Sequence, residues 1–482
     1  MPQASPVLRP RAAVAAAGTG IAAVASLQSL LIPALGAIGA DLHADAVGVT
    51  WTLTAWLITA AVATPLLGRA GDLVGRRRVM LVALLAVAVG SVAAAFAPTL
   101  ELLLAARVLQ GLGGAAFPLA FGLVRDAVPP QRVAGTIGIL AAIMAVGSGL
   151  GTVVAGPVSE TIGWRWLFVI PVALTALAIT LLLRSGVPAV RRPGRIDPVP
   201  AVLLSGWLVA LLLPLSSGAQ WGWGSPLVVG LFVLAAVLLV AWVAVEIRSH
   251  APLVDMRMMR IPAVWTSNAT ALFTGAAMFG VWAFLPRLAE TPATTGWGLG
   301  ATVSAVGIIM LPMLVAIATV GLVLGPLTRV FPLRVLLASG AALTGLASLG
   351  IAAFHAEVWQ FALAALVLGI GTGLVTSTTP NVIVRAVSGD QIGIATGMNS
   401  NIRTIGGALG TTVFTAVVAG TVDAAGLPTE GAYVAAFVVG GALALAGAVT
   451  PFLARVPRPV TEPIPVGQAR VLAEELEAEA AA

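Results

Sequence analysis

The stretch GRAGDLVGRRR, residues 68–78, lies between two apolar segments, 48–68 and 79–98. Each segment is long enough to cross a hydrocarbon core of about 30 Å as a helix that rises 1.5 Å per residue. A short stretch with four arginines and one aspartate between two such segments is typical of a loop that joins membrane helices. The sequence therefore predicts a helix, a tight turn and a second helix here.

The composition of the whole chain agrees with this local pattern. Of its 482 residues, 59% are hydrophobic and 9% are charged, and the mean hydropathy is +1.04. A soluble domain is usually ~25% charged, so these values exclude a water-soluble protein. All 25 basic residues are arginines, spread between apolar blocks rather than gathered on one basic face, which excludes a nucleic-acid-binding protein. The absence of cysteine excludes disulfides and thiolate metal sites.

Apolar runs of similar length recur along the chain, and about fourteen of them are long enough to span a membrane. The predicted spans are 12–38, 48–68, 79–98, 101–123, 134–158, 164–184, 198–218, 225–246, 262–286, 298–325, 332–353, 358–380, 392–421 and 431–453. The sequence thus predicts an all-α polytopic membrane protein.

The arginines are distributed unevenly between the two sides of the predicted spans. Breaks on one side carry 21 arginines, whereas the alternate breaks carry only Arg165 and Arg287. Because Arg-rich loops remain in the cytoplasm, this bias places both termini there. We expect a multi-pass plasma-membrane protein with a cytoplasmic segment at 1–11 and a disordered cytoplasmic tail at 454–482. The Ala-, Gly- and Arg-rich composition indicates a bacterial source.

Glycines and arginines recur along the chain at an offset of roughly 258 residues. The matching pairs are Gly68 and Gly325, Arg77 and Arg334, Gly111 and Gly369, Gly147 and Gly406, and Gly151 and Gly410. Two Gly-rich helices can look alike by chance, but one offset shared by three separate segments makes chance a weak explanation. We predict a six-helix bundle at 12–184, a linker with two inserted transmembrane helices at 185–261, and a second six-helix bundle at 262–453.

The opening stretch contains the groups needed for a polar latch between helices. Gly68 allows close helix approach, and Gly75 permits a tight reversal of the chain. Asp72 can face a helix N-terminus and pair with Arg76 or Arg77 in one conformation, and separate from them in another. The arginines also set the topology, and that alone would explain their presence. Glycine, acid, glycine and a basic pair at this spacing are more specific, however, and resemble the G-x-x-x-D-x-x-G-R-[RK] motif of the major facilitator superfamily.

Further motifs extend this resemblance along the chain. The matching residues are Arg107, Gln110 and Gly111 in span 4, and Gly147, Gly151, Gly156 and Pro157 in span 5. The span-5 residues are similar to the glycine-rich motif of drug exporters, and residues 393–410 resemble a signature of the 14-span drug:proton antiporter branch. The resemblance implies a major facilitator fold of six, two and six helices. It also implies export of drugs, antibiotics or secondary metabolites by proton antiport through alternating access.

The first span departs from the pattern of that branch. The branch usually carries an aspartate several residues before the proline that here is Pro33, but this sequence has Val24 near that position. An uncoupled or proton-symporting uptake carrier on the same fold therefore remains the alternative. A membrane sensor or scaffold that transports nothing is a third possibility, which the repeated motifs disfavour.

Two arginines, Arg107 and Arg403, lie inside predicted spans. A charge at the bilayer centre costs ~2.5–3.5 kcal/mol even on an insertion scale, so each side chain should face the protein interior or a hydrated cavity. Packing beside Gln110 and Asn399 would explain both arginines structurally, and contact with the substrate or the proton path is the functional alternative. Because both charges are positive, we expect a neutral or anionic amphiphile as the substrate.

A proton carrier must titrate, and arginine does not do so at accessible pH. No Asp, Glu, His or Lys occupies the middle of a predicted span. The remaining carrier candidates are Asp41, Glu101 and Asp72, which lie at span edges.

The spans also contain residues suited to an apolar cavity with a few polar groups. These candidates are Gln28, Phe117, Trp282, Asn399 and Arg403. No nucleophile–base set or carboxylate pair lies at a common depth, so we expect no enzymatic activity, no cofactor and no metal site. The expected partners are a small-molecule substrate, protons and the lipid bilayer, without nucleic acid, and the chain is expected to function as a monomer.

Overall fold

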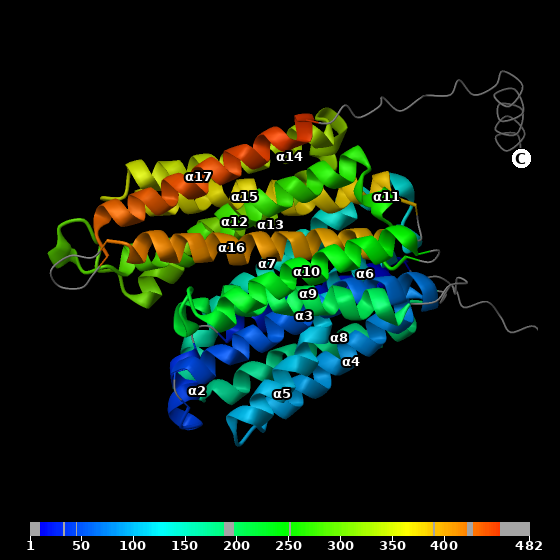
Figure 1. The fold of residues 1–482 in the computed structure, drawn as a ribbon, viewed down its shortest axis with the longest axis horizontal. Helices are drawn as coiled ribbons and strands as arrows, with labels where there is room; N and C mark the ends of the chain where they lie inside the picture. The colour runs from blue at the N-terminus through cyan, green and yellow to red at the C-terminus, as the bar shows by residue number, and fades with distance from the viewer. Residues whose placement is uncertain are drawn as a thin grey trace, which may run out of the picture.

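The computed structural model describes residues 10–31, 34–44, 46–187, 197–249, 252–388, 391–421 and 428–453. Most of these residues lie in long helices that run side by side (Figure 1). The predicted tail at 454–482, and the predicted N-terminal segment up to residue 9, lie outside the described residues.

The first part of the chain forms one group of packed helices. Its elements are α1 (Pro10–Leu30), α2 (Leu35–Asp41), α3 (Ala46–Val74), α4 (Arg76–Ala95), α5 (Leu100–Gly111), the 3-10 turn η2 (Leu112–Ala115), α6 (Ala116–Ala127), α7 (Pro130–Thr161), η3 (Trp164–Phe168) and α8 (Val169–Arg184). We call this group the N-terminal half.

The rest of the chain forms an inserted pair of helices and a second group. The insert consists of α9 (Pro198–Trp221) and α10 (Pro226–Arg248), followed by the short α11 (Met256–Met259). The second group, the C-terminal half, consists of α12 (Pro262–Glu290), η4 (Ala293–Thr295), α13 (Val303–Val330), α14 (Leu333–Ala353), α15 (Val358–Ala386), α16 (Ile392–Ala419) and α17 (Glu430–Leu453).

The helix lengths confirm the predicted polytopic fold. Among the described residues, 13 helical segments are long and apolar enough to cross a membrane, with α5, η2 and α6 together forming one of them. The 32-residue helix α7, apolar over Gly135–Gly149, supplies the remaining predicted span. The predicted bounds differ most in the first span, because α1 ends at Leu30 and a separate helix α2 follows. Pro33 lies between them, outside the described residues, and a proline disfavours helical backbone at the residue before it.

Two helix pairs make the most extensive contacts between the described parts of the halves: α3 packs against α16, and α7 packs against α13, while α6 also touches α16 and α7 also touches α15. Glycines allow close approach at both places. A Cβ atom on Gly68 of α3 would lie 2.7 Å from the carbonyl oxygen of Gly393, and one on Gly321 of α13 would lie 2.5 Å from the carbonyl oxygen of Gly138. Helix α9 packs on both α3 and α16, so the insert covers the α3–α16 interface (Figure 1).

Candidate functional site

The predicted latch residues Asp72 and Arg76 form an ion pair where α3 meets α16. Arg76 Nη2 lies 2.8 Å from Asp72 Oδ1, and Arg76 Nη1 lies 2.6 Å from Asp126 Oδ2 at the end of α6. Asp72 Oδ2 accepts hydrogen bonds from the backbone N–H groups of Gly393 (3.0 Å) and Ile394 (3.4 Å) in the first turn of α16. These N–H groups have no partner within their own helix and carry the positive end of its dipole. One carboxylate, only 5% exposed, therefore binds the N-terminal half to the C-terminal half.

The other latch residues shape the turn around this contact. Gly75 has φ 110° at the start of α4, a backbone conformation that favours glycine. Arg77 does not contact Asp72 but donates from Nε and Nη2 to the carbonyl oxygens of Leu182 and Leu183, both at 3.1 Å, at the end of α8. The structure thus brings Gly68, Asp72 and Arg76 together at α16 and gives Arg77 a capping role within its own half.

Among the described residues, Arg125 and Asn401 make hydrogen bonds across the halves that the sequence did not predict. Arg125 Nη1 at the end of α6 donates to the carbonyl oxygen of Val384 in α15 (3.0 Å). Asn401 Nδ2 in α16 donates to the carbonyl oxygen of Ala61 in α3 (2.6 Å). The sequence features that could have predicted these contacts are a polar residue at the end of a span, Arg125, and one inside a span, Asn401. We call the end of the molecule that carries residues 68–78 the latch end.

The span-4 motif forms a closed network inside the N-terminal half. Arg107 is 0% exposed; its Nε donates to the carbonyl oxygen of Thr52 (2.9 Å) and its Nη1 to Gln110 Oε1 (2.7 Å). Gln110 Nε2 in turn donates to Ser91 Oγ (3.2 Å), so the network ties α5 to α3 and α4. Gly111 allows the close approach, since a Cβ atom there would lie 2.5 Å from Cβ of Thr59. The contacts of Arg107 favour the structural interpretation of this arginine.

Arg403 in α16 has sparser contacts. Its Nη2 donates to Ser400 Oγ at 3.3 Å, and the side chain is partly exposed. One turn away, Asn399 Nδ2 donates to Asn268 Oδ1 in α12 (2.8 Å). Arg403 is therefore a partly exposed cation beside a pair of amides, and Ser400 is its one hydrogen-bond acceptor among the described residues.

The other cavity candidates lie on α1, α6 and α12. Gln28 on α1 is partly exposed, and Phe117 on α6 packs against two apolar clusters of the N-terminal half. Trp282 on α12 lies 6.1 Å from Phe279, measured between ring centres. None of these residues lines the cavity between α1, α7, α8 and α13 or the cavity between α9 and α10.

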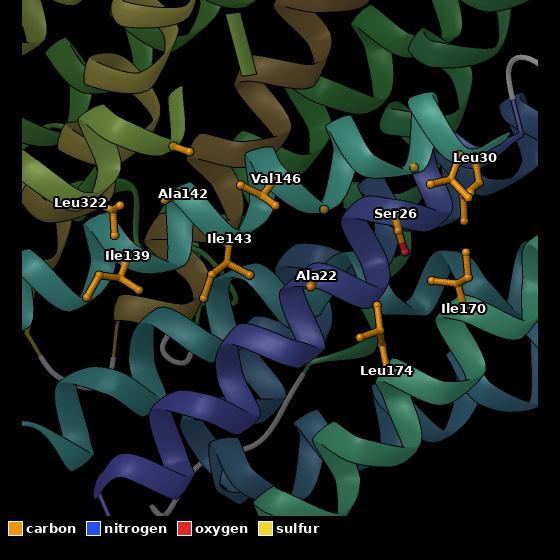
Figure 2. A pocket seen from close by; sticks show the side chains of 14 residues that line it. Ala22, Ser26, Leu30, Ile139, Ala142, Ile143, Val146, Ile170, Leu174 and Leu322 are labelled. Carbon is orange, nitrogen blue, oxygen red and sulfur yellow. The ribbon is translucent and has the colours of Figure 1, made fainter. Parts of the chain in front are cut away.

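The cavity between α1, α7, α8 and α13 has a volume of about 460 Å³ (Figure 2). We call it the lateral cavity. Its lining is Ala22, Ser26 and Leu30 of α1; Ile139, Ala142, Ile143, Val146, Gly147, Gly151 and Val154 of α7; Ile170 and Leu174 of α8; and Ala318 and Leu322 of α13. The hydroxyl of Ser26 donates to the carbonyl oxygen of Ala23 (2.9 Å), so the lining is almost wholly apolar. The span-5 glycines Gly147 and Gly151 thus help to form a surface that suits hydrocarbon.

The remaining span-5 residues, Gly156 and Pro157, lie near the C-terminal end of α7. Pro157 is exposed inside the helix, and its carbonyl oxygen accepts from Thr161 Oγ1 (2.7 Å). Gly156 belongs to the same helix.

The predicted proton carriers are placed at the surface or in ion pairs. Asp41 pairs with Arg165 and accepts from Trp164 Nε1 at 3.2 Å. The hydrogen bond from Arg165 holds the pKa of the Asp41 carboxyl below its usual range, so this group is ionised at neutral pH. Glu101 is exposed in the first turn of α5, and Asp72 is engaged by Arg76.

A buried acid that the sequence did not single out is Glu246 in α10, which is 2% exposed. It is the last residue of the predicted span 225–246, and this edge position was the only signal of its importance. Its contacts are described below.

The chain is similar to members of one large family. The sequence model described as Major Facilitator Superfamily matches residues 17–289 and 267–478. The MFS-type transporter Rv1877 of Mycobacterium tuberculosis is 30% identical over 418 residues, which cover 84% of this chain but only 59% of that protein. The tetracenomycin C resistance and export protein of Streptomyces glaucescens is 29% identical over 421 residues, 86% of this chain and 77% of that protein. The crystal structure of the human organic anion transporter MFSD10 has the same fold, with a TM-score of 0.65 at 16% identity over 92% of this chain and 99% of that one.

Proposed function

Because the chain belongs to the Major Facilitator Superfamily, we propose that it exports small amphiphilic compounds, such as drugs, antibiotics or secondary metabolites, in exchange for protons. The name of the Streptomyces relative supports export. The motifs of spans 4, 5 and 13 support the drug-exporting branch. Family and fold point to a transporter rather than an enzyme.

The observation that carries this proposal is the contact of Asp72 with the N-terminus of α16. It joins the two halves at the latch end, which the arginine bias assigns to the cytoplasm. Polar contacts of this kind hold one conformation and break in another. We therefore interpret the structure as a state closed towards the cytoplasm, from which rocking of the halves would expose the interior to the other side.

The substrate class follows from the interior cations. Arg107 is fully buried and donates from Nε to Thr52 and from Nη1 to Gln110. Among the described residues, Arg403 donates one hydrogen bond, to Ser400. Arg403 is therefore the group available to a ligand, and a guanidinium attracts neutral acceptors and anions rather than organic cations. This supports a neutral or anionic amphiphile as the substrate.

Dye accumulation in overexpressing cells tests both parts of the proposal. We expect lower accumulation of an anionic dye, fluorescein, than in cells without the protein, and an ionophore that collapses the proton gradient should restore it. Arg403→Ala should abolish the difference, and the exposed Arg334→Ala should preserve it. Normal export of the cationic dye ethidium by both the parent and Arg403→Ala would refute the assigned substrate class.

The alternative is an uptake carrier on the same fold. It is favoured by Val24, which is 0% exposed in an apolar cluster where the branch usually has an acid. Higher dye accumulation in expressing cells would identify uptake, and insensitivity to the ionophore would identify uncoupled transport.

A further inference from the structure

Glu246 is a buried acid, and only one of its two carboxyl oxygens accepts hydrogen bonds among the described residues. Its Oε1 accepts from Trp242 Nε1 and from the backbone N–H of Val254, both at 3.1 Å. Its Oε2 is buried and has no hydrogen-bond partner among the described residues. Glu246 thereby joins α10 of the insert to the segment that leads into α12.

Arg69 is the complementary group on α3. It lies in the latch stretch, one residue after Gly68 and three before Asp72, and its Nε is buried without a partner in the described part of the chain. Arg69 is close enough to Glu246 for the two side chains to interact electrostatically. No ion pair joins them within the described residues. Arg69 Nε and Glu246 Oε2 are thus unsatisfied atoms of opposite formal charge on neighbouring parts of the latch end.

Among the described residues, no other cation interacts with Glu246. Helix α9 contains no titratable residue between Pro198 and Trp221 and presents Trp207, whose ring centre lies 5.9 Å from that of Trp242. Asp255, at the start of α11, accepts from the backbone N–H of Arg257 (2.8 Å). Arg248, on α10 itself, is exposed. An ionised carboxylate in this position would leave a dehydrated oxygen without a donor, which is unfavourable, whereas a neutral carboxyl keeps Oε1 as the acceptor for both N–H groups.

We propose that Glu246 binds a proton on Oε2 in this conformation and forms an ion pair with Arg69 when the latch opens. The inference rests on the alternating access of the proposed function. Arg69 and Asp72 lie on the same helix, so the movement that withdraws Asp72 from α16 also moves Arg69. When Arg69 reaches Glu246, the proton leaves Oε2 for the water at the latch end, and the two unsatisfied atoms satisfy each other. The insert thus makes the closed conformation the proton-bound one.

The number of protons bound in each conformation determines how the equilibrium between the closed and open conformations depends on pH. The open conformation binds one proton fewer than the closed conformation, so it is favoured as the pH rises, by at most tenfold per pH unit. The closed conformation is favoured as the pH falls.

The protonation itself is measured by infrared difference spectroscopy on the full-length protein in lipid nanodiscs, with proton concentration as the only variable. We expect the carbonyl band of a buried neutral carboxyl group at mildly acidic pH, and its loss in Glu246→Gln. Asp197→Asn is the matched control, because Asp197 is the acid at the start of α9 in the same insert and asparagine also caps helices. A band that persists in Glu246→Gln overturns the assignment.

The coupling between Glu246, Arg69 and the opening of the latch is tested by measuring the distance between the two halves at the latch end. The chain has no cysteine, so spin labels on cysteines introduced at the exposed Arg78 and Arg385 report the separation of the halves at the latch end. We expect the longer distance to gain population with rising pH, and this dependence to be lost in Glu246→Gln and Arg69→Gln but kept in Asp197→Asn. A single distance at every pH, or a dependence that survives Glu246→Gln, overturns the proposal. These measurements need neither substrate nor gradient, so their outcome is separate from that of the export assay.

Discussion

The two main interfaces between the halves, α3–α16 and α7–α13, share a backbone geometry but differ in charge. Both are antiparallel helix crossings packed through glycine: Gly68 against Gly393 in one, and Gly321 against Gly138 in the other. The repeat pairs Gly68 with Gly325, an offset of 257, so the counterpart of Asp72 is residue 72 + 257 = 329, an arginine. A helix N-terminus attracts a carboxylate and repels a guanidinium. The α3–α16 interface therefore carries a charged latch, whereas the α7–α13 interface depends on close apolar packing.

The insert increases this difference. Helix α9 covers the α3–α16 interface, where Thr412 Oγ1 donates to the carbonyl oxygen of Leu215 (3.4 Å). Beside the α7–α13 interface lies the lateral cavity, with Val146 41% and Leu322 60% exposed at its rim. The α3–α16 interface should thus be sensitive to changes of side-chain charge, and the α7–α13 interface to changes of side-chain volume.

The largest effect is expected from Asp72→Asn. The substitution removes the charge from two hydrogen bonds to α16 and from the pair with Arg76. Hydrogen bonds to charged groups contribute ~1.5–3 kcal/mol each, so we expect the closed conformation to lose roughly 3 kcal/mol, a factor of about 100 in population. The Arg78–Arg385 label distance measures this shift.

Arg329→Asn is the matched control for Asp72→Asn at the other interface. Arg329 is exposed, and removing its charge should leave the label distance almost unchanged. Equal shifts in the two variants would show that the charge asymmetry of the interfaces has no mechanical consequence.

Gly321→Ala tests the volume sensitivity of the α7–α13 interface. The added Cβ would lie 2.5 Å from the carbonyl oxygen of Gly138 and 2.7 Å from Cβ of Ala142. Overpacking of this kind costs about 1–3 kcal/mol, and we expect a lower Tm in nanodiscs. Gly307→Ala, on the same helix with nothing within 4 Å of its added Cβ, should melt like the parent, and a similar Tm for both variants would contradict the close packing.

These contrasts also show what the sequence could and could not predict. The apolar spans, the reversal at Gly75 and the pairing of Asp72 with Arg76 are local, so hydropathy and residue spacing were sufficient for them. The partner of Asp72 on α16 lies more than 300 residues away, and Arg165, the partner of Asp41, lies 124 residues away. Glu246 was missed because its burial depends on packing by α9 and the segment before α12, which hydropathy at a span edge does not report.

Asp41→Asn separates stability from conformational change. The pKa of Asp41 is lowered by Arg165, so its contribution to stability is present at neutral pH and is lost as the pH falls through this lowered pKa. The pair is partly exposed, so we expect a loss of less than about 1 kcal/mol. The Tm of the parent should exceed that of the variant at neutral pH and converge with it in strong acid.

The Asp41–Arg165 pair lies within the N-terminal half, on α2 and η3, and crosses neither interface. The label distance at the latch end should therefore be the same in Asp41→Asn and in the parent. A changed distance would mean that the far end of the N-terminal half participates in the latch.

Arg329→Asp is the smallest and most informative change, because it gives the second interface the acid of the first. Along the antiparallel crossing, Gly321 meets Gly138 and Gly325 meets Gly135, so one further turn brings residue 329 to the first turn of α7. A carboxylate near a helix N-terminus at an exposed position contributes about 0.3–1 kcal/mol. We expect a slightly higher Tm than in Arg329→Asn and a small shift of the label distance towards the closed conformation, both reduced at high salt because exposed charges are screened. If Arg329→Asp and Arg329→Asn behave alike, the α7 N-terminus is out of reach of residue 329, and the asymmetry between the interfaces arises from helix register rather than from the identity of this one residue.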